Sequence, residues 1–403
     1  MEEFGEKYLK MVLEINKHFE GYVDSYFGPT TLKKEVEKSP PQEIAILRDE
    51  LESLSDLICE EGKRREYLEK CLKSMDTTLR IINGEELELY DEIKGLFDVR
   101  PNLMSDEDIA KMRETLQDIL TKDNNNDESS LYQLYREWAE QFRLDKGALS
   151  KAMNLTLEEV KARSSYLFPL VEGEEVQLNF TENQPWKAYN YYLGNATSKI
   201  EVNLDYPYYA FEIPRIMAHE TYPGHHLLMQ LREKILYHEK GYSEAAVCTL
   251  QSPLNVIAEG SANLAGEIIF PDTELHHWMG EVLFPEIDIK LTSSELDKFY
   301  QVLETANNLL MPEMSFNIIT NTTINYYTGK LDKKEADNYL KEYGLLSAET
   351  SASLMEMLET PLFRSYITIY SEGYHLVKNY VNNGNPQKRF KNLLTENILP
   401  SWL

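Results

Sequence analysis

Cysteine is scarce in this chain, and its placement excludes two classes of protein. The 403 residues include three cysteines, Cys59, Cys71 and Cys248, and no two of them form a CxxC pair. An odd number of widely spaced thiols is typical of a reducing compartment, and it builds neither a disulfide framework nor a cysteine-rich zinc site. Any metal site must therefore use histidine and carboxylate ligands.

Long apolar segments are also missing. No stretch approaches the roughly 18 uninterrupted apolar residues that a membrane helix requires. The first residues, MEEFGEKYLKMVLEINKHF, carry charges throughout and lack the basic start and apolar run of a signal peptide. We therefore expect a cytoplasmic protein without a membrane partner.

Positive charge is low relative to negative charge. The chain has 41 lysines and arginines against 68 aspartates and glutamates, which gives a formal net charge of −27. Nucleic acid and anionic membrane surfaces repel such a chain, so neither is an expected partner. The hydrophobic content of 42% instead predicts a folded globular protein with ample surface to bury.

Histidine is infrequent but clustered. Three of the eight histidines lie within His219–His226, which reads HETYPGHH. Neutral imidazoles bind divalent metals, and a carboxylate beside a ligand can take a proton from metal-bound water. The cluster therefore indicates a metal site, with Glu220 as the candidate general base.

The spacing of these histidines excludes a continuous helix. In the usual HExxH signature of zinc hydrolases the two ligands are four residues apart and share one helix face. His225 follows His219 by six residues, which is about 120° around and about 9 Å along a straight helix. His226 returns to the same face but lies about 10.5 Å from His219 along the axis.

Two helix-breaking residues explain how the site can still form. Pro223 stands at the usual second-ligand position and lacks the N–H that a helix needs. Gly224 can adopt a positive φ without steric cost. We predict that the helix is interrupted between Tyr222 and His225, so that His225, and not His226, reaches the ion.

Four elements of the sequence resemble those of a known family. His219–His226 is similar to the HExxPGHH signature of the DUF885 family, a group placed with the thermolysin-like (gluzincin) metallopeptidases. The other elements follow the family's order across most of the chain: Gly21–Pro29 (GYVDSYFGP, similar to GxVDxYxGP), Glu259–Ala262 (EGSA, similar to EGWA) and Tyr370–Gly373 (YSEG, similar to YxxG). Ser261 departs from the family's usual tryptophan, and the family's later glutamate is displaced by one position.

The resemblance implies one Zn²⁺ held by His219, His225 and Glu259, with the glutamate on a later helix. Two imidazoles and one carboxylate leave a fourth position open for water, as in hydrolytic zinc sites. Asn263, one turn after Glu259, could hydrogen-bond a ligand. The displaced glutamate, Glu267, stays open as an alternative third ligand.

Two further residues are candidates for contact with the substrate. A tetrahedral intermediate needs a hydrogen-bond donor besides the metal, and the resemblance selects Tyr370 over its neighbours Tyr374 and His375. His226 either donates to the substrate or oxyanion, or packs beside the ligands. The predicted catalytic set is thus Glu220, Tyr370 and His226.

Periodicity predicts a mainly α fold with a small antiparallel β-sheet, an α+β protein with a thermolysin-like core. Residues 1–168 have the apolar spacing of helices that wall a substrate channel. Residues 169–403 form the expected catalytic region, with a sheet over 174–204, active-site helices over 210–240 and 254–269, and a helical C-terminal part. Ile200–Leu204 either is an edge strand to which an extended peptide adds, or belongs to a purely structural sheet.

We expect zinc-dependent hydrolysis of peptide bonds in short peptides, with Glu-activated metal-bound water as the nucleophile. Hydrolysis of another amide or ester at the same site is one alternative. A non-catalytic binding protein with a vestigial metal site is the other. A carboxypeptidase needs a cation for the terminal carboxylate, and Arg215 and Arg364 are candidates for that role.

Overall fold

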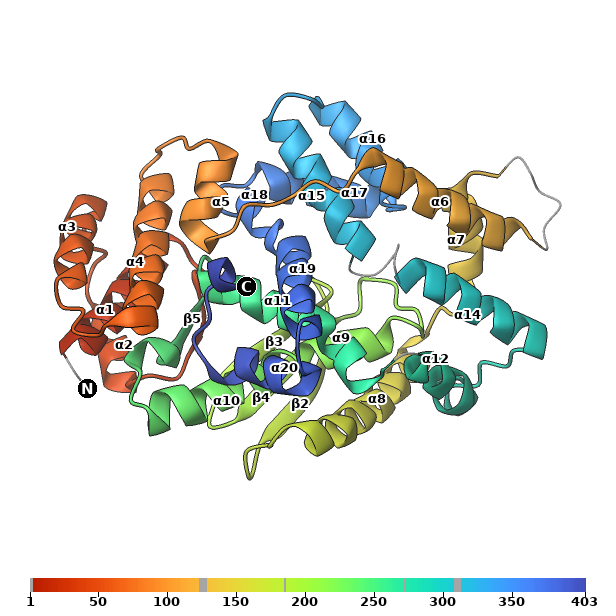
Figure 1. Ribbon diagram of the computed structural model, residues 1–403, viewed down its shortest axis with the longest axis horizontal. Coiled ribbons are helices and arrows are strands. Elements are labelled where there is room, and N and C mark those ends of the chain that lie inside the picture. The colour runs from red at the N-terminus through yellow and green to blue at the C-terminus, as the bar shows by residue number, and fades with distance from the viewer. Residues whose placement is uncertain (1–2, 123–128, 185, 272, 308–312) are drawn as a thin grey trace.

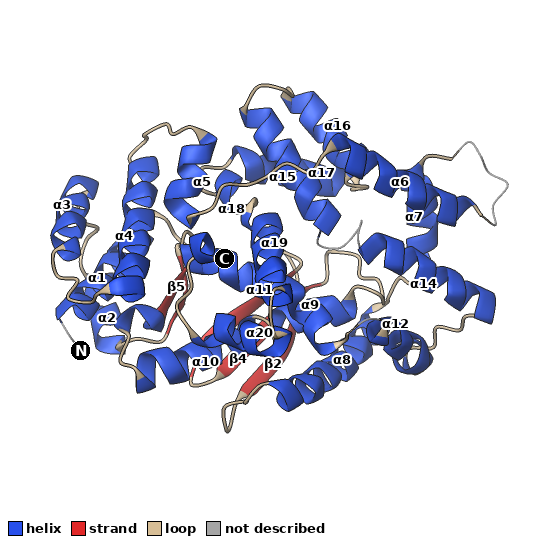
Figure 2. Cartoon of the chain, viewed as in Figure 1, coloured by secondary structure: helices blue, strands red, loops and turns tan. Residues whose placement is uncertain are grey.

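Helices make up most of the molecule, which confirms the predicted α+β class (Figures 1 and 2). The computed structural model describes residues 3–122, 129–184, 186–271, 273–307 and 313–403. Within these ranges no helix is both long enough and apolar enough to cross a membrane. The helices that precede the three-stranded sheet are α1 (Glu3–His18), α2 (Thr30–Lys38), α3 (Ile44–Ser55), α4 (Gly62–Ile82), α5 (Leu89–Phe97), α6 (Asp106–Thr121), α7 (Leu131–Glu140) and α8 (Lys146–Leu167).

The second half of the chain is also helical, apart from the short strand β5. The predicted active-site helices are present, and the first of them is divided. The α-helices here are α9 (Ile213–Glu220), α10 (His225–Leu231), α11 (Pro253–Ile269), α12 (Glu274–Trp278), α13 (Phe284–Glu286), α14 (Ser293–Asn307), α15 (Glu313–Tyr327), α16 (Lys333–Tyr343), α17 (Ala348–Glu359), α18 (Phe363–Tyr366), α19 (Ile369–Asn382) and α20 (Pro386–Thr395). Between them lie the π-helical segments η1 (Arg232–Glu239) and η3 (Met279–Leu283) and the 3₁₀ turn η2 (Ser243–Ala246). A second 3₁₀ turn, η4 (Pro400–Trp402), follows α20.

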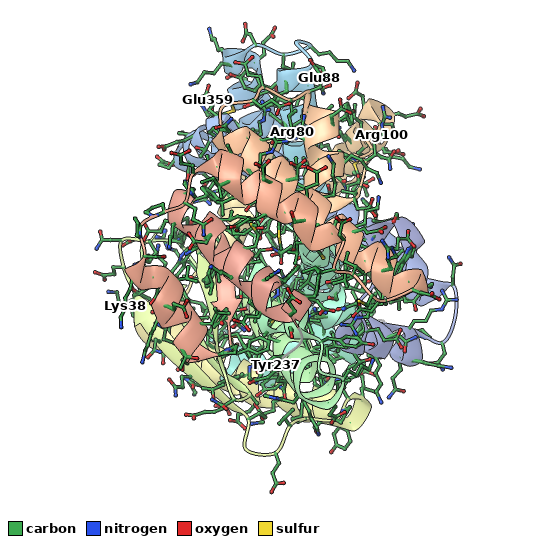
Figure 3. The ribbon with its side chains drawn as sticks, turned by 90° about the vertical axis from the view of Figure 1, so that its left-hand side faces the viewer. Lys38, Arg80, Glu88, Arg100, Tyr237 and Glu359 are labelled. Atoms are coloured by element: carbon green, nitrogen blue, oxygen red, sulfur yellow. The ribbon has the colours of Figure 1, made fainter. Side chains whose placement is uncertain are left out.

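The helices divide between two main hydrophobic cores. Helices α1 to α4 surround one core at the N-terminal end of the molecule, on the face where Figure 3 labels the exposed Lys38. The larger core holds both Val160 of α8 and Met217 of α9. It therefore extends across residue 168, and the division of the chain at that position stays a prediction.

The three-stranded sheet differs from the prediction in its strand order. It contains β2 (Glu175–Thr181), β3 (Ala188–Gly194) and β4 (Thr197–Asn203) in the order β2-β4-β3. Strand β4 pairs parallel with β2 and antiparallel with β3, so the sheet is mixed. Of the two interpretations of Ile200–Leu204, the edge strand is wrong, because β4 is central and the side chains of Ile200 and Val202 are fully buried.

A second sheet brings the N-terminal element to the middle of the molecule. Strand β1 (Val23–Tyr26) pairs antiparallel with β5 (Val247–Thr249), which directly precedes α11. The ladder shifts register between Val23 and Ser25, so the intervening residue Asp24 has no partner in the strand. Such bulges re-aim side chains, and Asp24 lies among the residues that line a central cavity.

Candidate metal centre

Backbone hydrogen bonds still connect α9 to α10 across the break, but each of them spans two more residues than a helical hydrogen bond does. The N–H of Gly224 donates to the carbonyl of Ala218 at 3.0 Å, and the N–H of Leu227 donates to Thr221 at 3.2 Å. Both steps are six residues, where a helix has four. The helix is interrupted as predicted, but the interruption covers residues 221–224 and therefore begins before Tyr222. It makes the six-residue step from His219 to His225 equivalent to the four-residue step of HExxH.

Gly224 is needed here for a different reason from the one predicted. Its φ is −77°, so the left-handed conformation is not used. A Cβ at this position would lie 1.9 Å from the carbonyl oxygen of His219 and 2.5 Å from that of Ala218. Gly224 therefore allows the two backbone segments to approach closely.

The residues on either side of Pro223–Gly224 are anchored to one carboxylate. Glu174 accepts a hydrogen bond from the Tyr222 hydroxyl, contacts His226 Nε2 at 3.0 Å and pairs with Lys161 at 2.6 Å. The other ring nitrogen of His226 contacts the Ser198 hydroxyl at 2.8 Å. His226 is fully buried and does not line the central cavity. The predicted catalytic role of His226 is therefore replaced by a structural one.

Replacing Glu174 by glutamine is expected to destabilise the protein by about 1–3 kcal/mol, because the buried donors Tyr222 and His226 and the partly exposed Lys161 lose a charged acceptor. Burial opposes ionisation of Glu174, but hydrogen bonds from His226, Lys161 and Tyr222 outweigh it and lower its pKa to about 2. The stabilisation is therefore fully present above pH 4.5 and is lost as the pH falls toward 2. Urea unfolding at several pH values measures this difference. The exposed neighbour Glu172, changed to glutamine, is the control and should have no effect.

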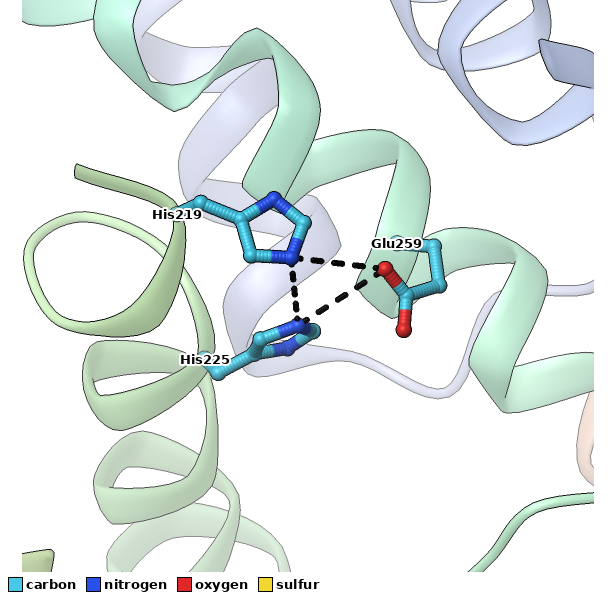
Figure 4. A group of neighbouring side chains, drawn as sticks. All are labelled: His219, His225 and Glu259. Atoms are coloured by element: carbon cyan, nitrogen blue, oxygen red, sulfur yellow. Dashed lines mark hydrogen bonds and ion pairs between the residues drawn. The ribbon is translucent and has the colours of Figure 1, made fainter. Parts of the chain in front are cut away.

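Three side chains converge at the divided helix (Figure 4). His219 Nε2 lies 3.1 Å from His225 Nε2, and Glu259 Oε2 lies 3.5 Å and 3.7 Å from these two nitrogens. Metal–ligand bonds of about 2.0–2.1 Å at tetrahedral angles separate ligand atoms by about 3.3 Å. The spacing therefore fits one small divalent ion bound by His219, His225 and Glu259.

The environment of these three groups also fits a cation. Burial lowers the pKa of His219 to about 4 and lowers that of His225 well below its usual value, so both rings are neutral and can donate a lone pair at pH 7. Glu259 is 6% exposed, and its Oε2 has no hydrogen-bond partner among the described residues. Burial raises the pKa of Glu259 to about 8. A divalent ion would supply the compensation that this carboxylate lacks.

Two glycines set the position of Glu259. Helix α11, which carries Glu259, crosses α19 so closely that a Cβ on Gly260 would lie 2.2 Å from the carbonyl oxygen of Gly373. These glycines belong to the EGSA and YSEG elements, so the crossing brings the two motifs together. The Tyr366 hydroxyl donates to Glu259 Oε1 at 3.1 Å and orients the carboxylate. Asn263 lies close enough to His219 to raise its pKa, against the larger effect of burial.

Glu220 lies beside the ligands in a cavity of about 100 Å³. Its side chain is 8% exposed and makes no hydrogen bond or ion pair with any described residue. Its backbone carbonyl accepts a 2.5 Å hydrogen bond from Asn190 of β3. Burial, with the nearby charges of Glu259 and Asp24, raises the pKa of Glu220 to about 8. Glu220 is thus an unpaired carboxyl group with a high proton affinity, which suits a general base.

Tyr370 lines the same cavity, together with two residues to which the sequence analysis gave no role. Burial and the charge of Glu259 raise the pKa of Tyr370 well above 10, so its hydroxyl is a hydrogen-bond donor at pH 7. Tyr366 was missed, although it precedes Tyr370 by four residues, the spacing of neighbours on one helix face. Asp24 lies in the GYVDSYFGP element, whose function the motif alone did not indicate.

The alternative ligand and donors predicted from the sequence lie elsewhere. Glu267 accepts a 2.5 Å hydrogen bond from Tyr374 and pairs with Lys378 at 3.3 Å, and all three line a separate cavity. His375 contacts the side-chain oxygen of Asn317 at 3.2 Å. The structure therefore places Glu259, and not Glu267, beside the two histidines, and it places Tyr370, and not Tyr374, in the cavity next to them.

Neither arginine considered for carboxylate recognition reaches the centre. Arg215 lines the separate cavity with Glu267. Arg364 pairs with Glu92 at 2.5 Å. No lysine or arginine is among the described residues that line the cavity beside Glu220.

Comparison with known proteins identifies the fold alone. No family model matches the chain. No curated protein matches it either. Among solved structures, the chain is similar to "the putative lipoprotein from Colwellia psychrerythraea", with a TM-score of 0.54 and 11% sequence identity over 88% of this chain. The match spans 64% of that protein's length.

Proposed function

We propose that this protein is a zinc-dependent hydrolase of peptide bonds in short peptides. The observation that carries the proposal is the convergence of His219, His225 and Glu259 at ligand spacing beside the unpaired carboxyl of Glu220. Two imidazoles, one carboxylate and an adjacent general base are the parts of a zinc hydrolase. The resemblance of the four sequence elements to the DUF885 family agrees with this function.

The residues of the cavity divide the chemistry between them. When bound, Zn²⁺ supplies Lewis-acid polarisation of the scissile carbonyl and lowers the pKa of water. Glu220 accepts the proton of the attacking water and passes it to the leaving amine. The Tyr370 hydroxyl donates a hydrogen bond to the oxygen that gains negative charge. The buried walls exclude bulk water, which strengthens both interactions.

The size and position of the cavity favour short substrates. Its volume of about 100 Å³ is too small for a folded chain, and β3, an edge strand of its sheet, contributes Tyr189, Asn190 and Tyr192 to the lining. An extended peptide could therefore lie along β3, where the sequence analysis had placed it along β4.

Metal removal tests the proposal. The protein stripped with a chelator is expected to lose peptide hydrolysis and to regain it on addition of one equivalent of Zn²⁺. Mass spectrometry of a peptide mixture detects the cleavage, and calorimetry measures the zinc stoichiometry. Cleavage of small amides or esters, but not of peptides, would favour a hydrolase of another amide or ester. Tight zinc binding without any hydrolysis would favour a binding protein.

A further inference from the structure

The cavity beside the metal centre contains more negative charge than a zinc hydrolase requires. Asp24, Glu220 and Glu259 all line it, and no lysine or arginine does so among the described residues. When all three carboxyl groups are ionised, a divalent ion offsets two of the three negative charges. One carboxylate therefore stays uncompensated in a buried space, where an unpaired charge is unfavourable.

Asp24 is the carboxylate that the proposed chemistry leaves unused. Its Oδ1 accepts a hydrogen bond from the Tyr189 hydroxyl, and no ion pair reaches it from the described residues. Asp24 occupies the point where the β1–β5 ladder shifts register, and its side chain faces the cavity. Strand β1 therefore directs a carboxylate into the site from the opposite end of the sequence.

We propose that Asp24 binds the free α-ammonium group of the substrate, so that the enzyme acts on the amino-terminal residue of short peptides. This inference rests on the proposed function, since it names the substrate class of the same site. An ammonium group supplies the missing positive charge and three donors for the carboxylate. A substrate carboxylate in this cavity would meet the carboxyl groups of Asp24 and Glu220 and no lysine or arginine among the described lining residues, which disfavours a carboxypeptidase.

The size of the cavity favours the α-ammonium over a cationic side chain. A volume of about 100 Å³ leaves room for only a small group beside the metal centre. A small terminal residue brings its ammonium group close to its own peptide bond. A lysine side chain places its charge at the end of a four-carbon chain and needs more room.

The first test measures selectivity in the zinc-loaded full chain. Wild type is expected to cleave Ala-Ala-amide with a kcat/KM at least about tenfold higher than that for its N-acetylated form. Asp24→Asn keeps the side-chain volume, removes the charge and should reduce this ratio by about tenfold or more. Equal cleavage of both peptides by wild type would overturn the inference and leave the proposed function intact. Asp24-dependent cleavage of N-acetyl-lysyl-alanine amide, without selectivity for Ala-Ala-amide, would assign Asp24 to a side chain instead.

The second test does not depend on hydrolysis. L-alaninol carries an ammonium group but no peptide bond, and 1,2-propanediol replaces that ammonium by a hydroxyl. The zinc-loaded protein should bind L-alaninol at least tenfold more tightly, as measured by ligand-observed NMR, and Asp24→Asn should remove the preference. Tyr189→Phe keeps the charge of Asp24 and should cause a smaller loss, about fivefold or less. If no peptide is cleaved but Asp24-dependent binding remains, the proposed function fails while the ammonium site stands.

Metal analysis completes the test. Circular dichroism and a content of one zinc per chain in Asp24→Asn show that the variant is folded and that Asp24 is not a ligand. A second bound zinc that disappears in this variant would overturn the inference, because Asp24 would then hold a metal.

Discussion

Glu220→Gln is expected to bind one Zn²⁺ with nearly wild-type affinity and to hydrolyse peptides about 10²–10⁴-fold more slowly. Glutamine has nearly the same shape but cannot accept a proton from water, and general-base catalysis contributes about this factor. Metal binding should survive because the ligand atoms come from His219, His225 and Glu259. The variant therefore separates the chemistry from the metal site.

Two matched glutamine variants make this result specific. Glu259→Gln should lose zinc, since its Oε2 lies within 3.7 Å of both histidine nitrogens. Glu267→Gln should keep both zinc and hydrolysis, because Glu267 lines the separate cavity. Hydrolysis at the wild-type rate by Glu220→Gln would contradict the assigned role of Glu220.

Glu220→Gln should also stabilise the metal-free protein. Burial raises the pKa of Glu220 to about 8, so ionising it in the folded chain costs free energy that the unfolded chain does not lose. This destabilisation begins above pH 4.5 and grows until pH 8. The advantage of Glu220→Gln in thermal unfolding should therefore increase over this window. A catalytic group kept at a cost to stability is expected at an active site.

The core of the metal site was predictable from the sequence because its constraints are local. The six-residue spacing of His219 and His225 is incompatible with one helix, and Pro223 and Gly224 are the residues that interrupt one. The position of the interruption follows from these facts. The sequence does not explain why a glycine is needed at position 224, because the close approach of its backbone to His219 becomes apparent only in three dimensions.

The role of His226 depended on a distant partner. Glu174 precedes His226 by 52 residues, and only the tertiary fold brings the two side chains together. A histidine beside a ligand has the same sequence environment whether it faces the substrate or a buried carboxylate. Sequence alone therefore left both interpretations open, and the contact with Ser198 on β4 distinguishes them.

The strand order was unpredictable for a related reason. Alternating residues identified strands within 174–204, but alternation does not determine which strand lies between the other two. Here β2 joins the sheet on the far side of β4, in parallel, and leaves β3 next to the metal centre. Asp24 is the strongest case, since 195 positions separate it from His219 and only the pairing of β1 with β5 brings it into the cavity.

Gly224→Ala should weaken zinc affinity by about 10–100-fold, the effect found when the support of a metal ligand is removed. The added Cβ would lie 1.9 Å from the carbonyl oxygen of His219, and that atom belongs to the backbone, so no side-chain rotation relieves the clash. The start of α10 must move away from α9, and His225 moves with it. The 3.1 Å separation of the two histidine nitrogens then cannot be kept.

Gly266→Ala is the matched control for this variant. Gly266 also lies in a helix near the site, but its added Cβ would lie 4.0 Å from Arg215 Cγ, which is ordinary contact. Alanine there should stabilise α11 by about 0.5–1 kcal/mol and leave zinc binding unchanged. Calorimetric zinc titration of both variants compares the two glycines directly. Wild-type zinc affinity in Gly224→Ala would show that the divided helix does not depend on close approach at this residue.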